Sequence, residues 1–245
     1  MPRDGQSAVS IALLFPELLG TYGDGGNATV LAQRLGWRGI DAEVVSVGAG
    51  EAIPETCDVY LMGGGEDGPQ TLAADELAES GALHRAVERG AVLLAVCAGF
   101  QVLGHEFAVP DGTSHAGLGL LDVRTVRGSG KRLVGELLVD PAVAGMPVLT
   151  GYENHASVTV LGRDARPLGR VVHGTGNGGG DGSEGAVGGK VVGTYLHGPA
   201  LARNPALADL LLSWVVGELA ALDDAEVDDL RAERLHAVKR RWRRT

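Results

Sequence analysis

Short apolar runs alternate with longer segments of helical periodicity along the first half of the chain. Four runs predict strands, at Val9–Phe15, Glu43–Val47, Val59–Met62 and Ala91–Val96. Continuous apolarity, clearest in the last of them, is typical of strands that are buried on both faces. These four strands are therefore expected to lie together inside one sheet.

Segments with helical periodicity separate the strands. Three are predicted as helices, at Asn27–Trp37, Leu72–Arg89 and Gly99–Phe107. The first helix carries an apolar stripe along one side, at Val30, Leu31, Arg34 and Leu35. Strand–helix alternation of this kind favours a parallel sheet with helices on both faces. The pattern predicts an α/β fold, a three-layer sandwich with a central, mostly parallel sheet.

The second half is richer in strand signals. The predicted strands are Leu118–Val126, Leu133–Val139, Ser157–Leu161, Gly169–Val172 and Val191–Leu196. The glycine-rich stretch Gly174–Gly189 has low complexity, which predicts a mobile surface loop. Two helices are predicted at the end, Pro205–Leu219 and Asp223–Arg244. We divide the chain into one domain at 1–222 and a charged helix at 223–245.

Composition and charge narrow the function classes. Hydrophobic residues make up 44% of the chain and charged residues 21%, an ordinary globular balance. The formal net charge of −10 disfavours nucleic-acid binding, because nucleic-acid binders present a basic face. No apolar run approaches the roughly 20 residues that span a bilayer, and no signal peptide is visible. We expect a cytoplasmic protein in which Cys57 and Cys97 are free thiols.

The end of the chain is basic, unlike the chain as a whole. Residues 231–245 contain seven Lys or Arg and one Glu. Three interpretations stay open: a solvated helix end, a contact with a partner protein, or attraction to the anionic inner face of a membrane. Sedimentation with liposomes, using the chain with and without residues 231–245, distinguishes the membrane interpretation from the other two.

The strand Ala91–Val96 runs directly into Cys97, Ala98 and Gly99 before a predicted helix. Small residues at a tight strand-to-helix turn are typical of a nucleophile elbow, which lifts the nucleophile out of the sheet edge. The helix N-terminus places partial positive charge near the sulfur and favours the thiolate. The alternative is a buried core cysteine, which is the commoner fate of the residue type. The position at the turn favours the nucleophile.

Acyl transfer also needs an oxyanion site and a base. Backbone N–H groups that point at the oxyanion stabilise it by about 3 kcal/mol each. The triplet Gly63–Gly65 follows a strand and offers such groups, with the Ala98 N–H as the second donor. His197 ends an apolar run, at the strand edge where open α/β sheets carry their sites. A plain glycine turn and an ordinary core histidine are the alternatives.

Four ordered segments resemble the cobyric-acid-synthase type (CobB/CobQ) of class I glutamine amidotransferases. Residues 97–101 (Cys-Ala-Gly-Phe-Gln) look like the nucleophile signature, and residues 60–67 (Tyr-Leu-Met-Gly-Gly-Gly-Glu-Asp) resemble the oxyanion strand and loop. Residues 151–155 (Gly-Tyr-Glu-Asn-His) and 193–198 (Gly-Thr-Tyr-Leu-His-Gly) resemble two further family segments. The resemblance implies a flavodoxin-like fold and glutamine hydrolysis.

The resemblance also implies site roles. The expected catalytic pair is Cys97 with His197, and the expected oxyanion donors are Gly64, Gly65 and Ala98. The expected contacts to L-glutamine are Arg132, Gln101, Asn154 and His155, of which Arg132 suits the substrate carboxylate. For His155 and for Glu153 a structural hydrogen-bonding role is favoured over chemistry. No metal and no cofactor are expected in this chain; ATP and Mg are expected on a partner.

Residues 14–27 (Leu-Phe-Pro-Glu-Leu-Leu-Gly-Thr-Tyr-Gly-Asp-Gly-Gly-Asn) resemble the stand-alone amidotransferase subunits of lipid II isoglutaminyl synthases. This resemblance implies a heterodimer with a Mur-ligase-like subunit, MurT. That subunit would use the ammonia for ATP-dependent amidation of the D-glutamate of lipid II. Asp24 in this segment is interpreted as a helix cap, or, from the resemblance, as an edge of the site or part of the subunit interface.

Several alternatives stay open. Class I relatives often place a Glu two residues after the histidine, but Pro199 stands there. Either the pair of Cys97 and His197 suffices, or another residue orients the imidazole. We hypothesise that the partner supplies this acidic group and so switches on glutaminase activity. A cobyrinic or cobyric acid amidotransferase is the second candidate; those enzymes carry a synthetase domain ahead of this one, and a first strand near Val9 leaves no room for it. A cysteine peptidase of the same fold and a non-catalytic relative are the third and fourth.

Overall fold

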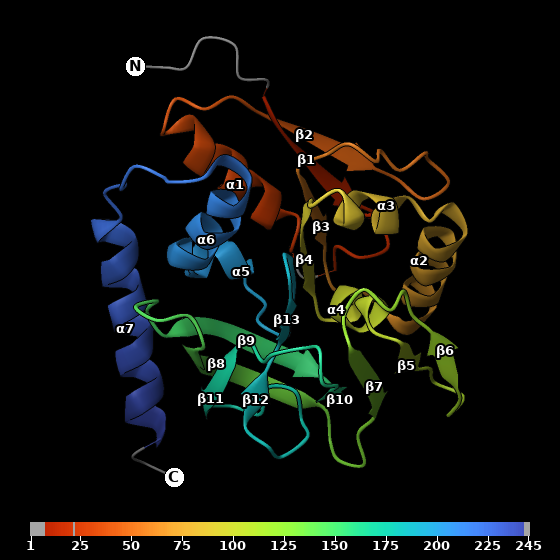
Figure 1. Cartoon of the computed structure of the whole chain (residues 1–245). Coiled ribbons are helices and arrows are strands. Elements are labelled where there is room, and N and C mark those ends of the chain that lie inside the picture. Colours follow the sequence, from red (N-terminus) through yellow and green to blue (C-terminus); the bar gives the residue numbers. More distant parts are fainter. Residues whose placement is uncertain (1–7, 22, 243–245) are drawn as a thin grey trace.

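The computed structural model describes residues 8–21 and 23–242 (Figure 1). Six strands form its central sheet in the order β13-β14-β4-β3-β1-β2. In chain order they are β1 (Val9–Leu14), β2 (Ala42–Val47), β3 (Val59–Met62), β4 (Val92–Val96), β13 (Ala186–Gly188) and β14 (Val191–Thr194). All neighbours pair in parallel except β13, which lies antiparallel to β14 at the edge. The prediction of a mostly parallel sheet is confirmed.

Helices cover both faces of this sheet. One face packs against α1 (Gly26–Gly36), α5 (Ala200–Arg203) and α6 (Pro205–Val216); the other packs against α2 (Asp67–Ser80), α3 (Ala82–Glu88) and α4 (Ala98–Leu103). Successive strand residues point to opposite faces, so Ile11 belongs to the first hydrophobic core and Ala12 to the second. The three-layer sandwich predicted from the apolar pattern is thereby confirmed.

Two smaller sheets lie at the end of the central sheet where α4 begins (Figure 1). One has the order β10-β7-β5-β6 and the other the order β12-β11-β8-β9. Their strands are β5 (Glu106–Ala108), β6 (Ser114–Ala116), β7 (Val123–Arg127), β8 (Leu133–Pro141), β9 (Leu149–His155), β10 (Ser157–Leu161), β11 (Gly169–His173) and β12 (Ser183–Glu184). The sequence predicted strands at β7, β8, β10 and β11, without this grouping into sheets, and did not predict β5, β6, β9 and β12.

Two predicted helices are shorter than expected. The segment 72–89 is divided between α2 and α3 because Gly81 takes a left-handed conformation, with φ of 60°, which a residue with a Cβ adopts at a cost. The helix expected to reach Phe107 ends at Leu103, and Glu106–Ala108 forms β5 instead. In both places a glycine marks the change of direction.

The prediction of a mobile loop at Gly174–Gly189 was wrong. The segment contains β12 and β13, and two of its polar side chains, Asn177 and Glu184, are 0% exposed. The Asn177 side chain donates to the Gly185 carbonyl at 3.0 Å and accepts from the Gly185 N–H at 2.9 Å. Buried polar side chains fix much of this segment, together with the buried Ala186, so its composition resembles that of a linker.

The C-terminal helix α7 (Ala225–Trp242) runs along one side of the molecule (Figure 1). Arg231 is buried and donates to the carbonyl oxygens of Val148 and Arg203. Near its start, Asp224 accepts from Arg34 of α1 at 2.8 Å, and Asp209 of α6 accepts from the same guanidinium at 2.7 Å. These two carboxylates pair with the buried charge of Arg34, which explains why an arginine stands in the apolar stripe of α1. The side chains of residues 239–245, on which the basic-tail interpretations rest, lie outside the described part.

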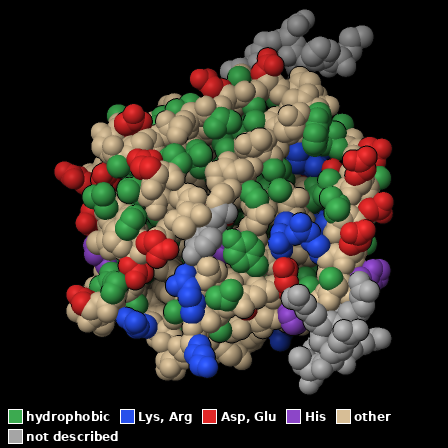
Figure 2. All heavy atoms as spheres, turned by 180° about the vertical axis from the view of Figure 1, so that it is seen from behind, with side chains coloured by type: hydrophobic (Ala, Val, Ile, Leu, Met, Phe, Trp, Pro, Cys, Tyr) green, Lys and Arg blue, Asp and Glu red, His purple; other side chains and the backbone are tan. Residues whose placement is uncertain are grey.

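The described part of the face shown in Figure 2 carries no continuous basic patch. On the side shown in Figure 2, Lys and Arg side chains are interrupted by acidic and hydrophobic ones. Among residues 8–21 and 23–242, no helix combines the length and the apolarity needed to cross a bilayer. Over the same residues, no three His, Cys, Asp or Glu side chains are arranged to hold a metal ion.

Gly193 in β14 provides a test of the packing between the sheet and α4. A Cβ added there would lie 1.9 Å from the Phe100 ring, so Gly193→Ala is expected to lower the free energy of unfolding by about 1–3 kcal/mol or more. Gly135→Ala in β8 is the matched control, because its Cβ would meet nothing within 4 Å. Urea unfolding measures both variants; equal effects would contradict the close packing at Gly193.

Candidate active site

Cys97 forms the turn between β4 and α4 in a strained backbone conformation, with φ of 53° and ψ of −108°. Among the described residues, Phe15 and Cys97 are the two non-glycine residues with positive φ. Such a conformation costs about 1–3 kcal/mol and persists only when its surroundings fix it. The Cys97 N–H donates to the Thr194 carbonyl at 2.8 Å, and the Gly99 N–H donates to the Gly63 carbonyl at 3.1 Å. This is the geometry of a nucleophile elbow.

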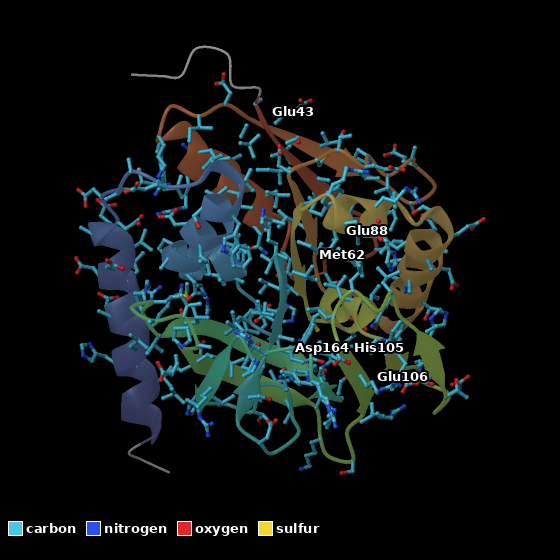
Figure 3. All side chains as sticks on the ribbon, viewed as in Figure 1. Glu43, Met62, Glu88, His105, Glu106 and Asp164 are labelled. Atoms are coloured by element: carbon cyan, nitrogen blue, oxygen red, sulfur yellow. The ribbon has the colours of Figure 1, made fainter. Side chains whose placement is uncertain are left out.

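The glycine triplet follows Met62, the last residue of β3, which Figure 3 labels near the middle of the molecule. A Cβ at Gly63 would lie 2.1 Å from the Leu19 carbonyl oxygen, and a Cβ at Gly65 would lie 2.3 Å from that of Leu18. Close approach of the chain at 18–19 therefore requires glycine at both positions. This packing accounts for the glycines whether or not their N–H groups act in catalysis.

The Gly64 N–H does not point to an open oxyanion site. It donates to the Asp24 carboxylate at 2.9 Å. The expectation that Gly64 supplies an oxyanion donor therefore does not fit this arrangement, since a hydrogen already given to a carboxylate is not available to a substrate. Gly65 and Ala98 are the two expected donors that line the cavity beside Cys97.

His197 lies beyond the end of β14 and is 0% exposed. It forms an isolated bridge with Tyr152 of β9: its N–H donates to the Tyr152 carbonyl at 2.9 Å, and its carbonyl accepts from the Tyr152 N–H at 3.2 Å. The Tyr152 ring stacks on the imidazole with 5.2 Å between centroids. The segment 151–155 thus positions the histidine from the neighbouring sheet.

Asp24 lies at the edge of the site, which was one of its predicted interpretations, and it is not a helix cap. The N-cap of α1 is Gly25 and has no side-chain cap, so Asp24 is not a capping residue. Its carboxylate is buried and lies 3.3 Å from His197 Nδ1. An acidic group beside the imidazole is therefore present in this chain, although Pro199 occupies the position expected for it. The only sequence signal for it was the resemblance of residues 14–27.

A cavity of about 180 Å³ lies beside Cys97. Its lining includes seven of the predicted site residues: Gly65, Cys97, Ala98, Gln101, Arg132, Asn154 and His155. Two predicted residues, Gly64 and His197, are not in its lining. Both of them contact Asp24: the Gly64 N–H donates to its carboxylate, and His197 Nδ1 lies 3.3 Å from it. The structure thus gathers all the predicted residues at one edge of the sheet.

Arg132 and Asn154 form one unit in the cavity wall. Arg132 Nε donates to Asn154 Oδ1 at 2.6 Å, and Nη2 donates to the Asn154 carbonyl at 3.3 Å. Asn154 is held in β9, where it pairs with Val134 of β8. Asn154 therefore orients the guanidinium, and Arg132 presents the positive charge that a substrate carboxylate would need.

Gln101 and His155 belong to a buried polar network. The Gln101 side chain accepts from Gln70 at 2.9 Å and donates to Ser157 at 3.1 Å. The His155 ring stacks on Tyr195 with 3.8 Å between centroids. Burial first, and then its charged neighbours, lower the pKa of His155 to about 4, so the ring is neutral at pH 7. Both residues shape the cavity floor more than they reach into it.

Glu153 has a structural role, as expected. Its carboxylate accepts from the Thr175 N–H at 2.9 Å and from the Gly176 N–H at 2.8 Å. It therefore ties β9 to the start of the glycine-rich segment.

The thiol of Cys97 is protonated in this state. Burial first, and then the charge of Asp24, raise its pKa to about 12, while the Ala98 N–H acts in the opposite direction. The expected contribution of the helix N-terminus is present but is outweighed by desolvation. Cys97 therefore needs a base, or a change in its surroundings, before it can attack.

Alkylation of Cys97 by iodoacetamide measures this directly. Only the thiolate reacts, so the rate is expected to be low at pH 8 and to rise with pH up to about 12. Asp24→Asn removes a negative charge that raises this pKa, and should increase the rate at pH 8 roughly threefold or more. Asp41→Asn, at the opposite edge of the sheet, is the control; a rate in Asp24→Asn at or below that of the unaltered chain would contradict the electrostatic role.

Solved structures with the same fold include two glutamine amidotransferases and a glutaminase domain. A crystal structure of a glutamine amidotransferase matches with a TM-score of 0.58 and 23% identity, covering 85% of this chain and 100% of the other. The glutaminase domain of Trypanosoma brucei CTPS with bound acivicin gives 0.53 and 12%, covering 87% and 96%. A Thermotoga maritima glutamine amidotransferase gives 0.51 and 18%, covering 94% and 86%.

Similar sequences place the chain more narrowly. A GatD subunit of lipid II isoglutaminyl synthase (glutamine-hydrolyzing) from Staphylococcus aureus (strain N315) is 39% identical over 79% of each chain. The GatD subunit from Streptococcus pneumoniae is 34% identical, covering 84% of this chain and 79% of that one. Cobyric acid synthase from Sphingopyxis alaskensis is 37% identical over 78% of this chain but only 39% of its own length. The CobB/CobQ-like glutamine amidotransferase domain matches residues 10–205, and with Cys97 on its elbow in that domain the chain belongs to this family of glutamine amidotransferases.

Proposed function

We propose that this chain is the glutaminase subunit of a lipid II isoglutaminyl synthase. It hydrolyses L-glutamine at Cys97 and delivers ammonia to a separate Mur-ligase-like subunit, MurT, which would bind ATP and Mg. The observation that carries the proposal is the match to two GatD subunits over about four-fifths of their length and of this chain. The proposed assembly is a heterodimer.

The chemistry follows from the groups around the cavity. The Cys97 sulfur attacks the side-chain carboxamide carbon of glutamine, and the carbonyl electrons move to the oxygen. His197 takes the thiol proton and gives it to the departing nitrogen, so ammonia leaves and a thioester remains. Water then cleaves the thioester and releases glutamate. The proposed donors to the oxyanion are the N–H groups of Gly65 and Ala98.

Substrate selection rests on Arg132. Its guanidinium suits the α-carboxylate of glutamine, and Asn154 holds it in place. Gln101 and His155 contribute by closing the floor of the cavity. A cavity of about 180 Å³ restricts the site to a small ligand.

Two carboxylates could orient His197. Asp24 is 3.3 Å from Nδ1 but also accepts from the Gly64 N–H, so one oxygen serves two neighbours. We propose that Asp24 holds the imidazole in the free subunit and that an acidic group of the partner completes the arrangement. The protonated thiol of the free chain is consistent with a site that becomes active only when the partner binds.

This proposal predicts activation by the partner. The free subunit is expected to hydrolyse glutamine at least about tenfold more slowly than the complex, because its buried thiol stays protonated. Ammonia release by the subunit alone and by the complex measures the ratio. Full activity of the free subunit would rule out an activating contribution from the partner.

Cys97→Ala tests the division of labour between the subunits. The variant complex is expected to lose glutamine-dependent amidation of lipid II and to retain amidation with free ammonia, because the synthetase step does not use the thiol. Cys57→Ala is the matched control, since the other buried cysteine is remote from the cavity. Amidation by Cys97→Ala with glutamine as sole nitrogen source would contradict the proposal.

A cobyrinic or cobyric acid amidotransferase is the second candidate, and it uses the same chemistry. The relative from Sphingopyxis alaskensis supports it at 37% identity, but this chain spans less than half of that protein's length. Supplying cobyrinic acid and lipid II as competing acceptors separates the two. Cleavage of peptides without ammonia release would instead support a peptidase.

A further inference from the structure

At the end of β14, close to the site, two backbone N–H groups lose their strand partners. Up to Thr194, β14 pairs in parallel with β4, where Thr194 lies opposite Val96. Three residues later, His197 pairs with Tyr152 of another sheet. Between them the chain changes partners, so the N–H groups of Tyr195 and Leu196 must find acceptors outside a strand ladder.

Two side chains supply these acceptors. The Tyr195 N–H donates to Glu184 Oε1 at 2.7 Å, and the Leu196 N–H donates to Thr194 Oγ1 at 3.0 Å. The Thr194 hydroxyl in turn donates to the same Glu184 oxygen at 2.8 Å. One carboxylate oxygen therefore fixes both peptide groups that lead to His197.

The same residue also touches the nucleophile turn. The Thr194 carbonyl accepts from the Cys97 N–H at 2.8 Å. Thr194 thus connects to Cys97 through its backbone and to the His197 segment through its hydroxyl. Glu184 is the group that orients this hydroxyl, although Glu184 lines no part of the cavity.

Glu184 is held by the glycine-rich segment. It is 0% exposed, and the neighbouring Gly185 is clamped by Asn177 on both its N–H and its carbonyl. The other carboxylate oxygen, Oε2, has no hydrogen-bond partner among the described residues. Burying a carboxylate is costly, so its retention here calls for a role that an apolar residue could not fill.

We propose that Glu184 is a positioning residue for glutamine hydrolysis, which sets the relative placement of Cys97 and His197 through Thr194 and Tyr195. It does not touch the substrate. The glycine-rich segment, which carries Glu184, then stabilises the position of the site residues and is not merely a surface loop. The inference rests on the proposed roles of Cys97 and His197.

The protonation state of Glu184 does not alter the geometry. Burial first raises its pKa to about 7, against the hydrogen bonds from Tyr195 and Thr194. A neutral carboxyl still accepts at Oε1. A glutamine side chain therefore keeps the acceptor at Oε1 and removes only the ionisable group, whereas alanine removes the acceptor. Comparing the two substitutions shows whether the hydrogen bonds, rather than the charge, are needed.

The experiment compares Glu184→Ala, Glu184→Gln and Thr194→Val with the unaltered chain. Glutamine hydrolysis by the full chain with its partner is measured, and kcat is expressed per active site titrated with an alkylating glutamine analogue. Glu184→Ala and Thr194→Val are expected to lose roughly 100-fold in kcat, the effect of a displacement of about 1 Å, with KM within about threefold. Glu184→Gln should stay within about threefold of the unaltered kcat.

A second readout separates positioning from folding. Displacement of Cys97 relative to His197 lowers kcat for each titrated site and leaves KM nearly unchanged. A merely structural loss would instead lower the number of titrated sites and leave kcat per site unchanged. Glu55→Ala removes an exposed carboxylate at the opposite edge of the sheet and is the control.

The outcomes are distinct. An unchanged kcat per site in Glu184→Ala, or a Glu184→Gln variant as slow as Glu184→Ala, would overturn the inference. If Glu184→Ala does not fold, Thr194→Val decides, since it keeps the shape of the side chain and removes only the hydroxyl. Glutamine hydrolysis by Cys97→Ala would instead overturn the proposed nucleophile, which is a separate failure.

Discussion

The strained turn at Cys97 is held from both neighbouring strands, and the site depends on this double attachment. The Thr194 carbonyl of β14 fixes the N–H of Cys97, and the Gly63 carbonyl at the end of β3 fixes that of Gly99. A backbone with φ of 53° relaxes if either contact is lost. Parallel pairing makes the arrangement available, because it brings the carboxyl ends of three strands to one edge.

Electrostatics and burial act in opposite directions around the sulfur. Burial raises the pKa of the Cys97 thiol to about 12, and the nearby carboxylate of Asp24 adds to the effect. The same burial limits the bulk water around the sulfur, which strengthens the electrostatic interactions within the site. It also disfavours the charged thiolate in the resting site.

Much of this was readable from the sequence, for a physical reason. Strands buried on both faces leave continuous apolar runs, as at Val92–Val96, and the elbow leaves small residues after its nucleophile. Glu184 was not found as a site residue and Asp24 was placed only at an edge of the site, because their roles depend on contacts with other elements of the fold: Asp24 with His197 and Glu184 with Tyr195. Residues 174–189 were misjudged because polar side chains, together with the buried Ala186, order much of the segment.

Main-chain atoms form much of the catalytic edge. The carbonyl oxygens of Leu18, Leu19 and Gly63 lie where the Cβ atoms of Gly65, Gly63 and Gly99 would be. Such contacts are indifferent to the identity of the residues that supply the carbonyls. Substitution of Leu18 or Leu19 by another residue therefore leaves these main-chain contacts in place, whereas any side chain at Gly63 or Gly65 would collide with a carbonyl oxygen.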